Sequence, residues 1–384
     1  WDKMRLMSES ARGEGGRLWV YGDSKKSIIN PQGQLVPCGI TGVPWYFLEE
    51  LYPLYGNLVP RDIASRVILK ICSMGLGIDG EMQVYLDLTE LPPERLKKLT
   101  SILEIYEKFT GEDPRKVPMR IFPAVHYSMG GAWVDWPASD DPDRFMRFRQ
   151  MTNLTGLFNV GESDFQYHGA NRLGANSLLS CLFGGLVTAQ ECLRYIEGLK
   201  DSYHNIPELV FEESLKKEEE IKLEILSRSG PENVFKLSDE LADFLVQYVT
   251  VTRNNKDLAR TIDKIKEIKE RAKKVDLRDT SRFQNQSYIF ANQFDAMLEL
   301  ALVITKSALL RDESRGSHFK TDFPERDDKN WLKTTVAEYA VDEPKIFYKD
   351  VEMRYIKPRV RDYTKKDTES FEFTNLPDSI PLPV

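Results

Sequence analysis

The polar residues that follow an apolar run in the middle of the sequence are the strongest candidates for chemistry. The run, Leu157 to Val160, is typical of a strand, and Gly161 and Glu162 follow it with a flexible backbone and a carboxylate. A loop with glycines, hydrogen-bonding side chains and one cation, Arg172, then leads into a helical pattern. A strand end, a polar loop and a helix N-terminus together predict a site for a planar or anionic group.

The helical pattern begins at Asn176, and its apolar residues share one broad face, with Gly184 and Gly185 allowing close packing. That face comprises Leu178, Leu179, Leu182, Phe183, Leu186 and Val187. The carboxylate of Glu162 could accept hydrogen bonds from sugar-like hydroxyls. Ser177 and Leu178 open the helix, whose positive end favours negative charge nearby. An ordinary N-cap is the alternative role for Ser177, and both roles can hold together.

The stretch from Gly156 to Ala189 resembles the flavoprotein subunit of succinate dehydrogenase and fumarate reductase. That family carries a strand GL(F/Y)xxGE and a loop and helix HG(A/G)NRLG(A/G)NSL, and this sequence has GLFNVGE and HGANRLGANSLL. The resemblance implies FAD as the cofactor. It implies that Glu162 holds the ribityl chain, and that Asn176, Ser177 and Leu178 bind at the flavin, with the Ser177 and Leu178 amides facing the pyrimidine edge.

The start of the chain resembles a second motif of the same family. Residues 8–16, SESARGEGG, are similar to its (T/S)ExxRGEGG segment. In the family a large section precedes this point and carries a GxGxxG fingerprint and the histidine that bonds covalently to FAD, and neither is present here. We therefore expect the C-terminal part of a longer protein. A catalytically inert fragment that needs its N-terminal section is one alternative.

Arg61 is the predicted catalytic residue. In the segment NLVPRD it resembles the family's active-site arginine, which exchanges a proton with the substrate carbon. Composition alone would favour a surface Arg-Asp pair at a helix start. A guanidinium normally stays protonated, so proton transfer needs a dry site and a carboxylate that reloads the arginine. Glu9 and Asp62 are the candidates, and the resemblance favours Glu9.

A substrate site with two carboxylate-binding groups follows from the same resemblance. A lone histidine beside apolar residues is usually structural, but His126 lies in HYSMGG, which resembles the family motif whose histidine bonds a substrate carboxylate. Arg172 would clamp the other carboxylate with its planar fork. With Ser8 and Glu9, these residues would fix a C4 dicarboxylate. Succinate would then lose a hydride to FAD N5 and a proton to Arg61. A soluble fumarate reductase or an L-aspartate oxidase is the alternative.

Charge and hydropathy restrict the partners. A net charge of −7 without a basic face disfavours nucleic acid. No run approaches the about 18 apolar residues that span a bilayer, so we expect no direct membrane span and no signal peptide. The four cysteines, Cys38, Cys72, Cys181 and Cys192, lack CxxC or zinc spacing and are expected to be reduced thiols.

These cysteines fit no familiar iron–sulfur pattern, so electrons that leave a flavin need a partner. The family resemblance implies two partners, an iron–sulfur subunit and a membrane-anchor cytochrome b subunit. It also implies a peripheral position at the cytoplasmic face of the bacterial inner membrane.

The sequence predicts a mixed α+β and α/β multidomain fold. We expect an α+β capping domain over residues 1–122, the C-terminal part of a Rossmann-like FAD-binding domain over 123–202, a helical bundle over 203–316 and a C-terminal domain and tail over 317–384. Expected elements are a hairpin within 23–43, a helix from Arg61 to about Met74, a strand over 82–88 and helices over 92–109, 209–228, 237–252, 255–275 and 287–311. In the 255–275 helix, Leu258, Ile262, Ile265, Ile268 and Ala272 form one apolar stripe.

Three further segments have predicted roles without catalysis. Residues 313–333 resemble the family's ESRG segment, and we expect a buried polar network there that joins the helical and flavin domains, with His318 structural. His168 is expected to be a structural contact on the flavin side. Residues 137–149 are expected to form a surface excursion. The tail contains strand-like residues 346–348 and 353–356 and ends in a partner-dependent segment.

Overall fold

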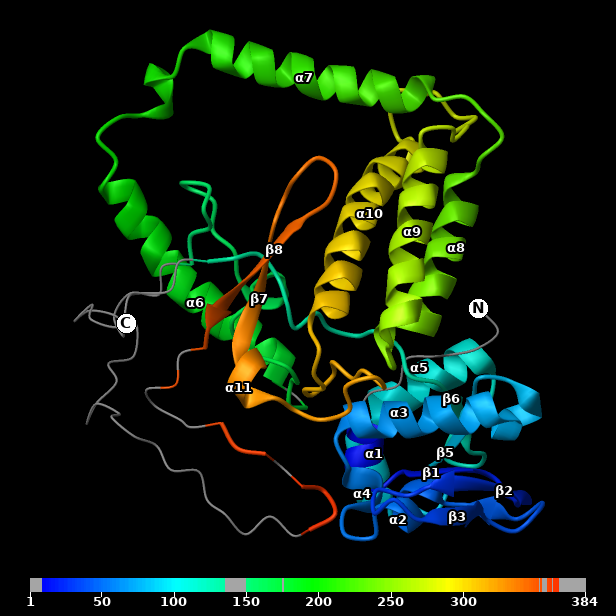
Figure 1. The fold of residues 1–384 in the computed structure, drawn as a ribbon. Coiled ribbons are helices and arrows are strands. Elements are labelled where there is room, and N and C mark those ends of the chain that lie inside the picture. Colours follow the sequence, from blue (N-terminus) through cyan, green and yellow to red (C-terminus); the bar gives the residue numbers. More distant parts are fainter. Residues whose placement is uncertain are drawn as a thin grey trace, which may run out of the picture. The chain divides into compact units, whose positions relative to one another are not determined.

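The computed structural model describes residues 9–134, 150–174 and 176–351, together with 353, 358–360 and 362–365 (Figure 1). These residues form two compact units. Unit 1 contains the described residues up to Ser128 and those from Met353 onward, and unit 2 contains the described residues between. The predictions for Ser8, for residues 137–149, for residues 354–356 and for the Glu9 side chain lie outside the described residues.

Unit 1 is built on a four-stranded antiparallel sheet with the order β4-β1-β5-β6. The strands are β1 (Arg17–Tyr21), β4 (Pro44–Trp45), β5 (Val84–Asp87) and β6 (Met119–Ile121). In β5 the side chains of Val84 and Leu86 are buried while their neighbours are half-exposed, which confirms the predicted alternation. A separate hairpin, β2 (Asp23–Ile29) and β3 (Leu35–Cys38), confirms the hairpin predicted within residues 23–43.

The helices of unit 1 complete a single apolar core. They are α1 (Glu9–Gly13), α2 (Phe47–Leu51), α3 (Arg61–Ile71), α4 (Pro93–Lys98) and α5 (Thr100–Thr110). Core side chains include Trp45, Phe47, Ile71, Leu103, Tyr106 and Met119, each at most 1% exposed. The regular helix predicted to reach Met74 ends at Ile71, because a π turn (Cys72–Leu76) follows in which Gly75 has φ 73°. The helix predicted over 92–109 is divided at Leu99 into α4 and α5.

Unit 2 consists mainly of helices. They are α6 (Asn176–Glu197), α7 (Glu208–Ser227), α8 (Val234–Leu245), α9 (Asn255–Ala272), α10 (Gln286–Leu310) and α11 (Asp328–Trp331). A two-stranded antiparallel ribbon follows, β7 (Lys333–Glu338) and β8 (Lys345–Asp350). The asparagines Asn233, Asn254 and Asn285 cap α8, α9 and α10 by accepting from first-turn amides. The four helices predicted after residue 208 are confirmed.

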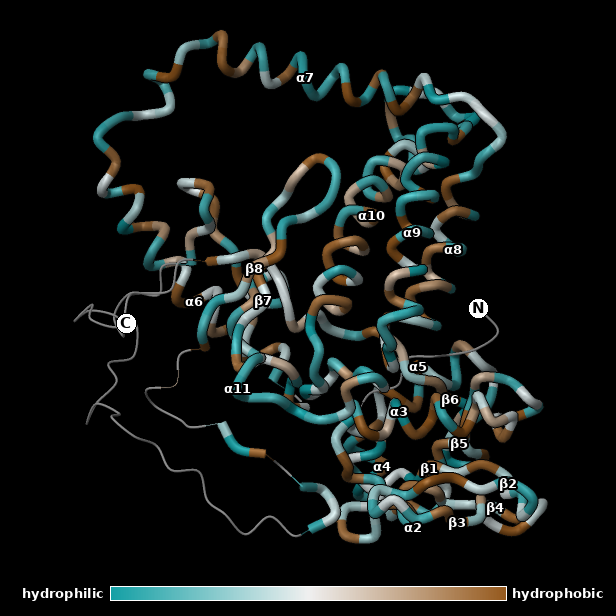
Figure 2. The backbone as a smooth tube through the Cα atoms, viewed as in Figure 1, coloured by the Kyte–Doolittle hydropathy of each residue, from teal (hydrophilic) through white to brown (hydrophobic). Residues whose placement is uncertain are grey.

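Helices α8, α9 and α10 run side by side and share a core (Figure 1). In Figure 2 hydrophobic residues recur on successive turns of α9 and α10. The predicted stripe of α9 is buried, with each of its five residues at most 9% exposed. Most of the other residues of α9 are charged, and Arg271 pairs with Glu232 and Glu240. The 3.6-residue period therefore predicted both the helix and its buried face.

The segment before and along α6 differs from its prediction. Leu157 to Val160 do not form a strand: Phe158 makes only an isolated antiparallel bridge with Met151. The pairing is limited to Thr152 N donating to Leu157 O at 2.8 Å and Asn159 N donating to Gln150 O at 2.8 Å. Five apolar residues of the α6 face are 36–73% exposed, namely Leu178, Leu179, Leu182, Phe183 and Leu186. Only Val187, at 3%, is buried. The four-domain division stays a prediction.

Candidate functional site

Glu162 lies in a single helical turn that is packed against α6. The turn η4 (Gly161–Ser163) begins at Gly161 with φ 69°, a conformation that glycine adopts without strain. A Cβ on Gly161 would lie 3.0 Å from Cys181 Sγ, and a Cβ on Gly184 would lie 2.7 Å from Tyr167 Oη. The predicted close packing is thus confirmed at Gly184, and the Glu162 side chain remains exposed.

A buried polar cluster next to this turn was not predicted from the sequence. Gln150 and Asp164 are 1% and 3% exposed, and Gln166 Nε2 donates to Asp164 Oδ2 at 2.9 Å. The Gln150 amide nitrogen donates to the same oxygen at 2.7 Å. Burial raises the pKa of Asp164, although the Gln166 hydrogen bonds partly offset it, and burial together with Asp164 raises the pKa of Tyr167. No spacing rule connects residues 14 positions apart in a loop, so no sequence signal was available.

The loop that carries Arg172 is attached to the first turns of α6. Arg172 is 5% exposed, and its backbone N donates to Met129 Sδ at 3.0 Å. Ser180 Oγ donates to Ser177 O at 2.7 Å and therefore accepts from His168 Nε2 at 3.1 Å. Burial and then the charge of Arg172 lower the pKa of His168, which favours the neutral ring. This contact agrees with the structural role expected for His168.

The N-terminus of α6 offers hydrogen-bond donors on the same helix that packs against the Glu162 turn. The helix has 22 residues and begins at Asn176, so Ser177 lies inside its first turn and the proposed N-cap role is wrong. The first amides of a helix have no acceptor within it, and its positive end favours negative charge. An exposed carboxylate that can accept from hydroxyls and a helix N-terminus that can donate to a carbonyl edge form a set of groups that fits the ribityl chain and pyrimidine ring of a flavin.

Arg61 and His126, the other predicted site residues with described side chains, belong to unit 1. Arg61 is the first residue of α3 and is half-buried, and His126 lies outside regular structure and is exposed. Asp62 Oδ2 accepts from Arg66 NH2 at 2.9 Å, so this carboxylate is already paired. Glu9 begins α1. The structure therefore groups Glu162, Arg172 and the α6 N-terminus in unit 2, and Arg61 and His126 in unit 1.

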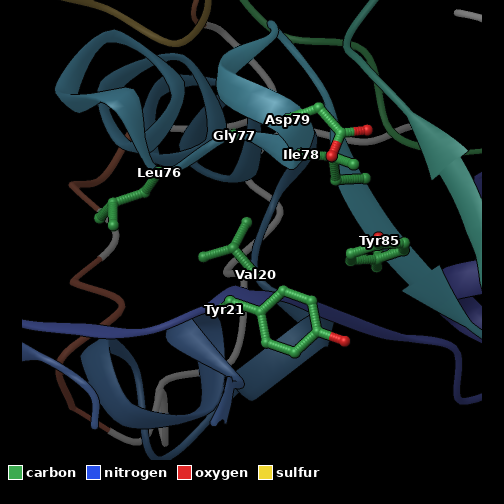
Figure 3. A pocket seen from close by; sticks show the side chains of 7 residues that line it. All are labelled: Val20, Tyr21, Leu76, Gly77, Ile78, Asp79 and Tyr85. Carbon is green, nitrogen blue, oxygen red and sulfur yellow. The ribbon is translucent and has the colours of Figure 1, made fainter. Parts of the chain in front are cut away.

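Two hollows in the described part of the chain do not coincide with these residues. A hollow of about 80 Å³ in unit 1 lies between the end of β1, residues 76–79 and Tyr85 of β5, as Figure 3 shows. A second space, of about 240 Å³, lies between α7 and the loop that contains Phe283. Both are smaller than the roughly 300–1,000 Å³ of ordinary ligand pockets. Neither contains a predicted site residue.

Other features bear on partners and redox state. All four cysteines are free thiols, and Cys38 and Cys72 are buried. Burial raises the pKa of the Cys72 thiol to about 11. Across the described residues no helix combines the length and apolar character needed to cross a membrane.

Comparison with known proteins places these features in a family. Residues 1–178 match the family model described as FAD binding domain, and residues 238–363 match that described as Fumarate reductase flavoprotein C-term. The succinate dehydrogenase flavoprotein subunit of Bacillus subtilis (strain 168) is 50% identical over 369 residues, covering 95% of this chain and 58% of that protein. The fumarate reductase flavoprotein subunit of Escherichia coli (strain K12) is 32% identical over 367 residues, covering 93% of this chain and 56% of that protein.

A solved structure gives the same result for the fold. An E. coli quinol fumarate reductase matches with a TM-score of 0.74 and 31% identity, covering 94% of this chain and 59% of that chain. The chain thus spans somewhat more than half the length of the relatives it matches. The mixed fold predicted from the sequence is confirmed. The chain belongs to the family of succinate dehydrogenase and fumarate reductase flavoprotein subunits, an oxidoreductase family whose cofactor is FAD.

Proposed function

We propose that this chain is part of the flavoprotein subunit of a succinate dehydrogenase, which oxidises succinate to fumarate. The observation that carries this proposal is the 50% identity to the B. subtilis succinate dehydrogenase subunit, against 32% to the E. coli fumarate reductase subunit over a similar length of the chain. The family motifs around His126, Arg172 and Ser177 support it.

Arg172 and His126 would fix the two carboxylates of the substrate. A guanidinium binds a carboxylate bidentately, and Arg172 is 5% exposed, so its charge acts where little water competes. His126 would hold the other carboxylate, with Ser8 and Glu9 completing the site. Binding both ends of a C4 dicarboxylate fixes the orientation of its central carbons, and positioning of this kind supplies much of a catalytic rate.

Arg61 would accept the proton that leaves the substrate carbon, and when bound FAD accepts the hydride from the neighbouring carbon. Since Asp62 is paired with Arg66, Glu9 is the better candidate for the carboxylate that takes the proton onward from Arg61. Glu162 would accept hydrogen bonds from the ribityl hydroxyls. Asn176, Ser177 and Leu178 would provide the amides and helix end that stabilise negative charge on the flavin pyrimidine ring.

The electrons would leave through other subunits. The cysteine spacing of this chain fits no iron–sulfur pattern, so we propose an iron–sulfur subunit and a membrane-anchor cytochrome b subunit as partners. The protein would then lie at the cytoplasmic face of the bacterial inner membrane, as a peripheral component. Relatives named as subunits, and one named as a quinol fumarate reductase, support this arrangement.

The test is succinate-dependent reduction of an artificial electron acceptor by the full-length protein. We expect succinate oxidation, with competition by malonate, a diacid that cannot be dehydrogenated in this way. Fumarate reduction is the runner-up, supported by the TM-score of 0.74 to a quinol fumarate reductase. Fast turnover with fumarate and a low-potential electron donor, together with negligible turnover with succinate, would favour a fumarate reductase. Oxygen-dependent turnover of L-aspartate without succinate oxidation would instead indicate an aspartate oxidase.

A second measurement separates an active subunit from an inert fragment. Flavin absorbance is recorded for the purified 384-residue chain and for the full-length protein. Flavin in the full-length protein alone would mean that residues outside this chain are needed to retain FAD. Flavin in both would show that the 384-residue chain suffices for binding.

A further inference from the structure

A tight turn after α10 is held by a dense network of buried polar contacts. In this turn, residues 315–318, Arg315 N donates to His318 O at 2.7 Å and His318 N donates to Arg315 O at 3.1 Å. Glu313 is completely buried and accepts from Arg315 Nε at 2.8 Å. Lys320 is also completely buried and donates from Nζ to Asp312 Oδ1 at 2.7 Å. Because so many contacts fix its base, the turn is a rigid element.

His318 closes the network from the side of the helical bundle. Its Nε2 lies 3.0 Å from Arg311 O, and its Nδ1 lies 2.5 Å from Arg253 NH1. Since a guanidinium only donates, Nδ1 is the acceptor and Nε2 carries the proton. Arg253 follows α8 and its π turn in the chain, so the bundle and the turn are joined directly. This confirms a buried polar network of the kind predicted for residues 313–333.

The tip of the turn contacts the loop that carries Arg172. Both Ser317 N and Ser317 Oγ donate to Ala170 O, at 2.9 and 3.0 Å. Gly316 approaches so closely that a Cβ there would lie 2.4 Å from Ala170 O and 2.9 Å from Asn171 Cβ. Gly316 also has φ 58°, which strains any other residue. These contacts join residues 147 positions apart in the sequence.

Two further contacts attach this loop besides the one at Ala170. His168 is bound to Ser180 of α6, and Arg172 N donates to Met129 Sδ. A thioether is a weak acceptor, so the two bonds to Ala170 O hold the loop backbone more firmly than the contact with Met129 Sδ does. The orientation of the Arg172 guanidinium depends on the backbone that these contacts hold.

We propose that Gly316 and Ser317 position Arg172 for binding of the substrate carboxylate, an inference that rests on the function proposed above. Ser317 is a positioning residue: it acts through Arg172 and does not touch the substrate. The physical reason is that a shift of about 1 Å in a substrate-binding group can cost about 100-fold in rate. A bifurcated bond to one carbonyl, set by a rigid turn, opposes such a shift.

The experiment measures malonate affinity in the full-length, flavin-loaded protein, from the perturbation of the flavin spectrum. Ser317→Ala removes the hydroxyl bond and keeps the backbone one, and we expect affinity to fall about five- to tenfold. Gly316→Ala forces the turn away from Ala170 and should lower the malonate affinity further. Ser317→Thr keeps the hydroxyl and should therefore keep most of the malonate affinity. The matched control is Ser214→Ala, on an exposed α7 serine that bonds only Val210 O of its own helix at 2.8 Å.

A double-mutant cycle distinguishes positioning from general stability. If Ser317 acts through Arg172, Ser317→Ala should have little further effect on malonate affinity in an Arg172→Lys background. The same fold loss in both backgrounds, or unchanged malonate affinity in Ser317→Ala, would overturn the inference. Failure of the proposed function looks different, because the unsubstituted protein itself would then neither bind malonate nor oxidise succinate. If Gly316→Ala does not fold, the hydroxyl deletion and its threonine rescue still decide the question.

Discussion

Two regions of the chain hold predicted site residues in different ways. One is unit 1. The other, called here the flavin-side segment, comprises the described residues of unit 2 from Met129 to Lys200. In unit 1 the sheet and helices bury a continuous apolar core that includes Ile71 and Leu103. The flavin-side segment is held by close glycine contacts and buried polar groups such as Asp164, while leucines of α6 remain exposed. Hydrophobic periodicity thus predicts that a helix forms, but whether its apolar face is covered depends on residues elsewhere.

The largest expected effect comes from Arg61→Ala, which tests whether the well-packed unit carries chemistry. Arg61 is half-buried at the first position of α3, outside the apolar core, so its loss should leave the fold intact. A group that transfers a proton contributes about 100- to 10,000-fold to a rate. We expect succinate oxidation by the full-length protein to be abolished while the flavin stays bound.

Steady-state rates and flavin absorbance measure this prediction. Lys70→Ala, at an exposed position on the same helix, is the matched control and should keep both. Near-normal turnover in Arg61→Ala would refute the role in proton transfer. Loss of flavin together with activity would point to a structural role instead.

The second prediction compares one leucine from each region. Leu103 is 1% exposed in unit 1, and Leu182 is 67% exposed on α6. Truncating a buried leucine to alanine costs about 2–5 kcal/mol, whereas surface changes usually stay within about 0.5 kcal/mol. In the 384-residue chain, denaturant unfolding should show a large loss of stability for Leu103→Ala and almost none for Leu182→Ala. Equal losses would mean that the α6 face is covered in solution.

Secondary structure and burial could be predicted best where the residue pattern of a single segment determines them. The stripe from Leu258 to Ala272 specified a helix and its buried face together, and alternation specified β5. The run from Leu157 to Val160 had the composition of a strand but failed, because a strand also needs a partner ladder that a single segment cannot specify. The contact of Ser317 with Ala170 was beyond prediction for the same reason, since it depends on two loops distant in sequence.

The third prediction concerns the polar network of unit 2, which has a pH dependence that an apolar core lacks. Burial and the neighbouring Arg253 charge lower the pKa of His318 to about 4, from an ordinary value of about 6.5. The unfolded chain therefore takes up this proton first as the pH falls. The stability from the neutral ring is complete above about pH 6.5 and is lost as the pH falls through about 4. At about 1.4 kcal/mol per pKa unit, the free energy of unfolding decreases by about 3 kcal/mol over this pH range.

Hydrogen exchange of amides in residues 311–320, followed between pH 4 and 7, measures this loss after correction for intrinsic exchange rates. His318→Gln keeps an acceptor and a donor but does not titrate, so its profile should be flatter in this range. His204→Gln, at an exposed histidine, is the matched control. A profile for His318→Gln as steep as that of the unsubstituted chain would contradict the assignment of the acid loss to this ring.

The smallest expected effect comes from alanine substitutions at two adjacent glycines of α6 that have different surroundings. A Cβ on Gly184 would lie 2.7 Å from Tyr167 Oη and 3.3 Å from Gly161 N, whereas a Cβ on Gly185 meets nothing within 4 Å. Alanine is favoured over glycine in a helix by up to about 1 kcal/mol. In the 384-residue chain, Gly185→Ala should therefore slow hydrogen exchange of the α6 amides, while Gly184→Ala should accelerate it because η4 is pushed away. Repeating both substitutions in the full-length protein sharpens the comparison with unit 1. If Gly185→Ala is destabilising in the full-length protein, other residues cover the side of α6 that is exposed in the 384-residue chain. The difference in burial between α6 and unit 1 would then be a property of the 384-residue chain alone.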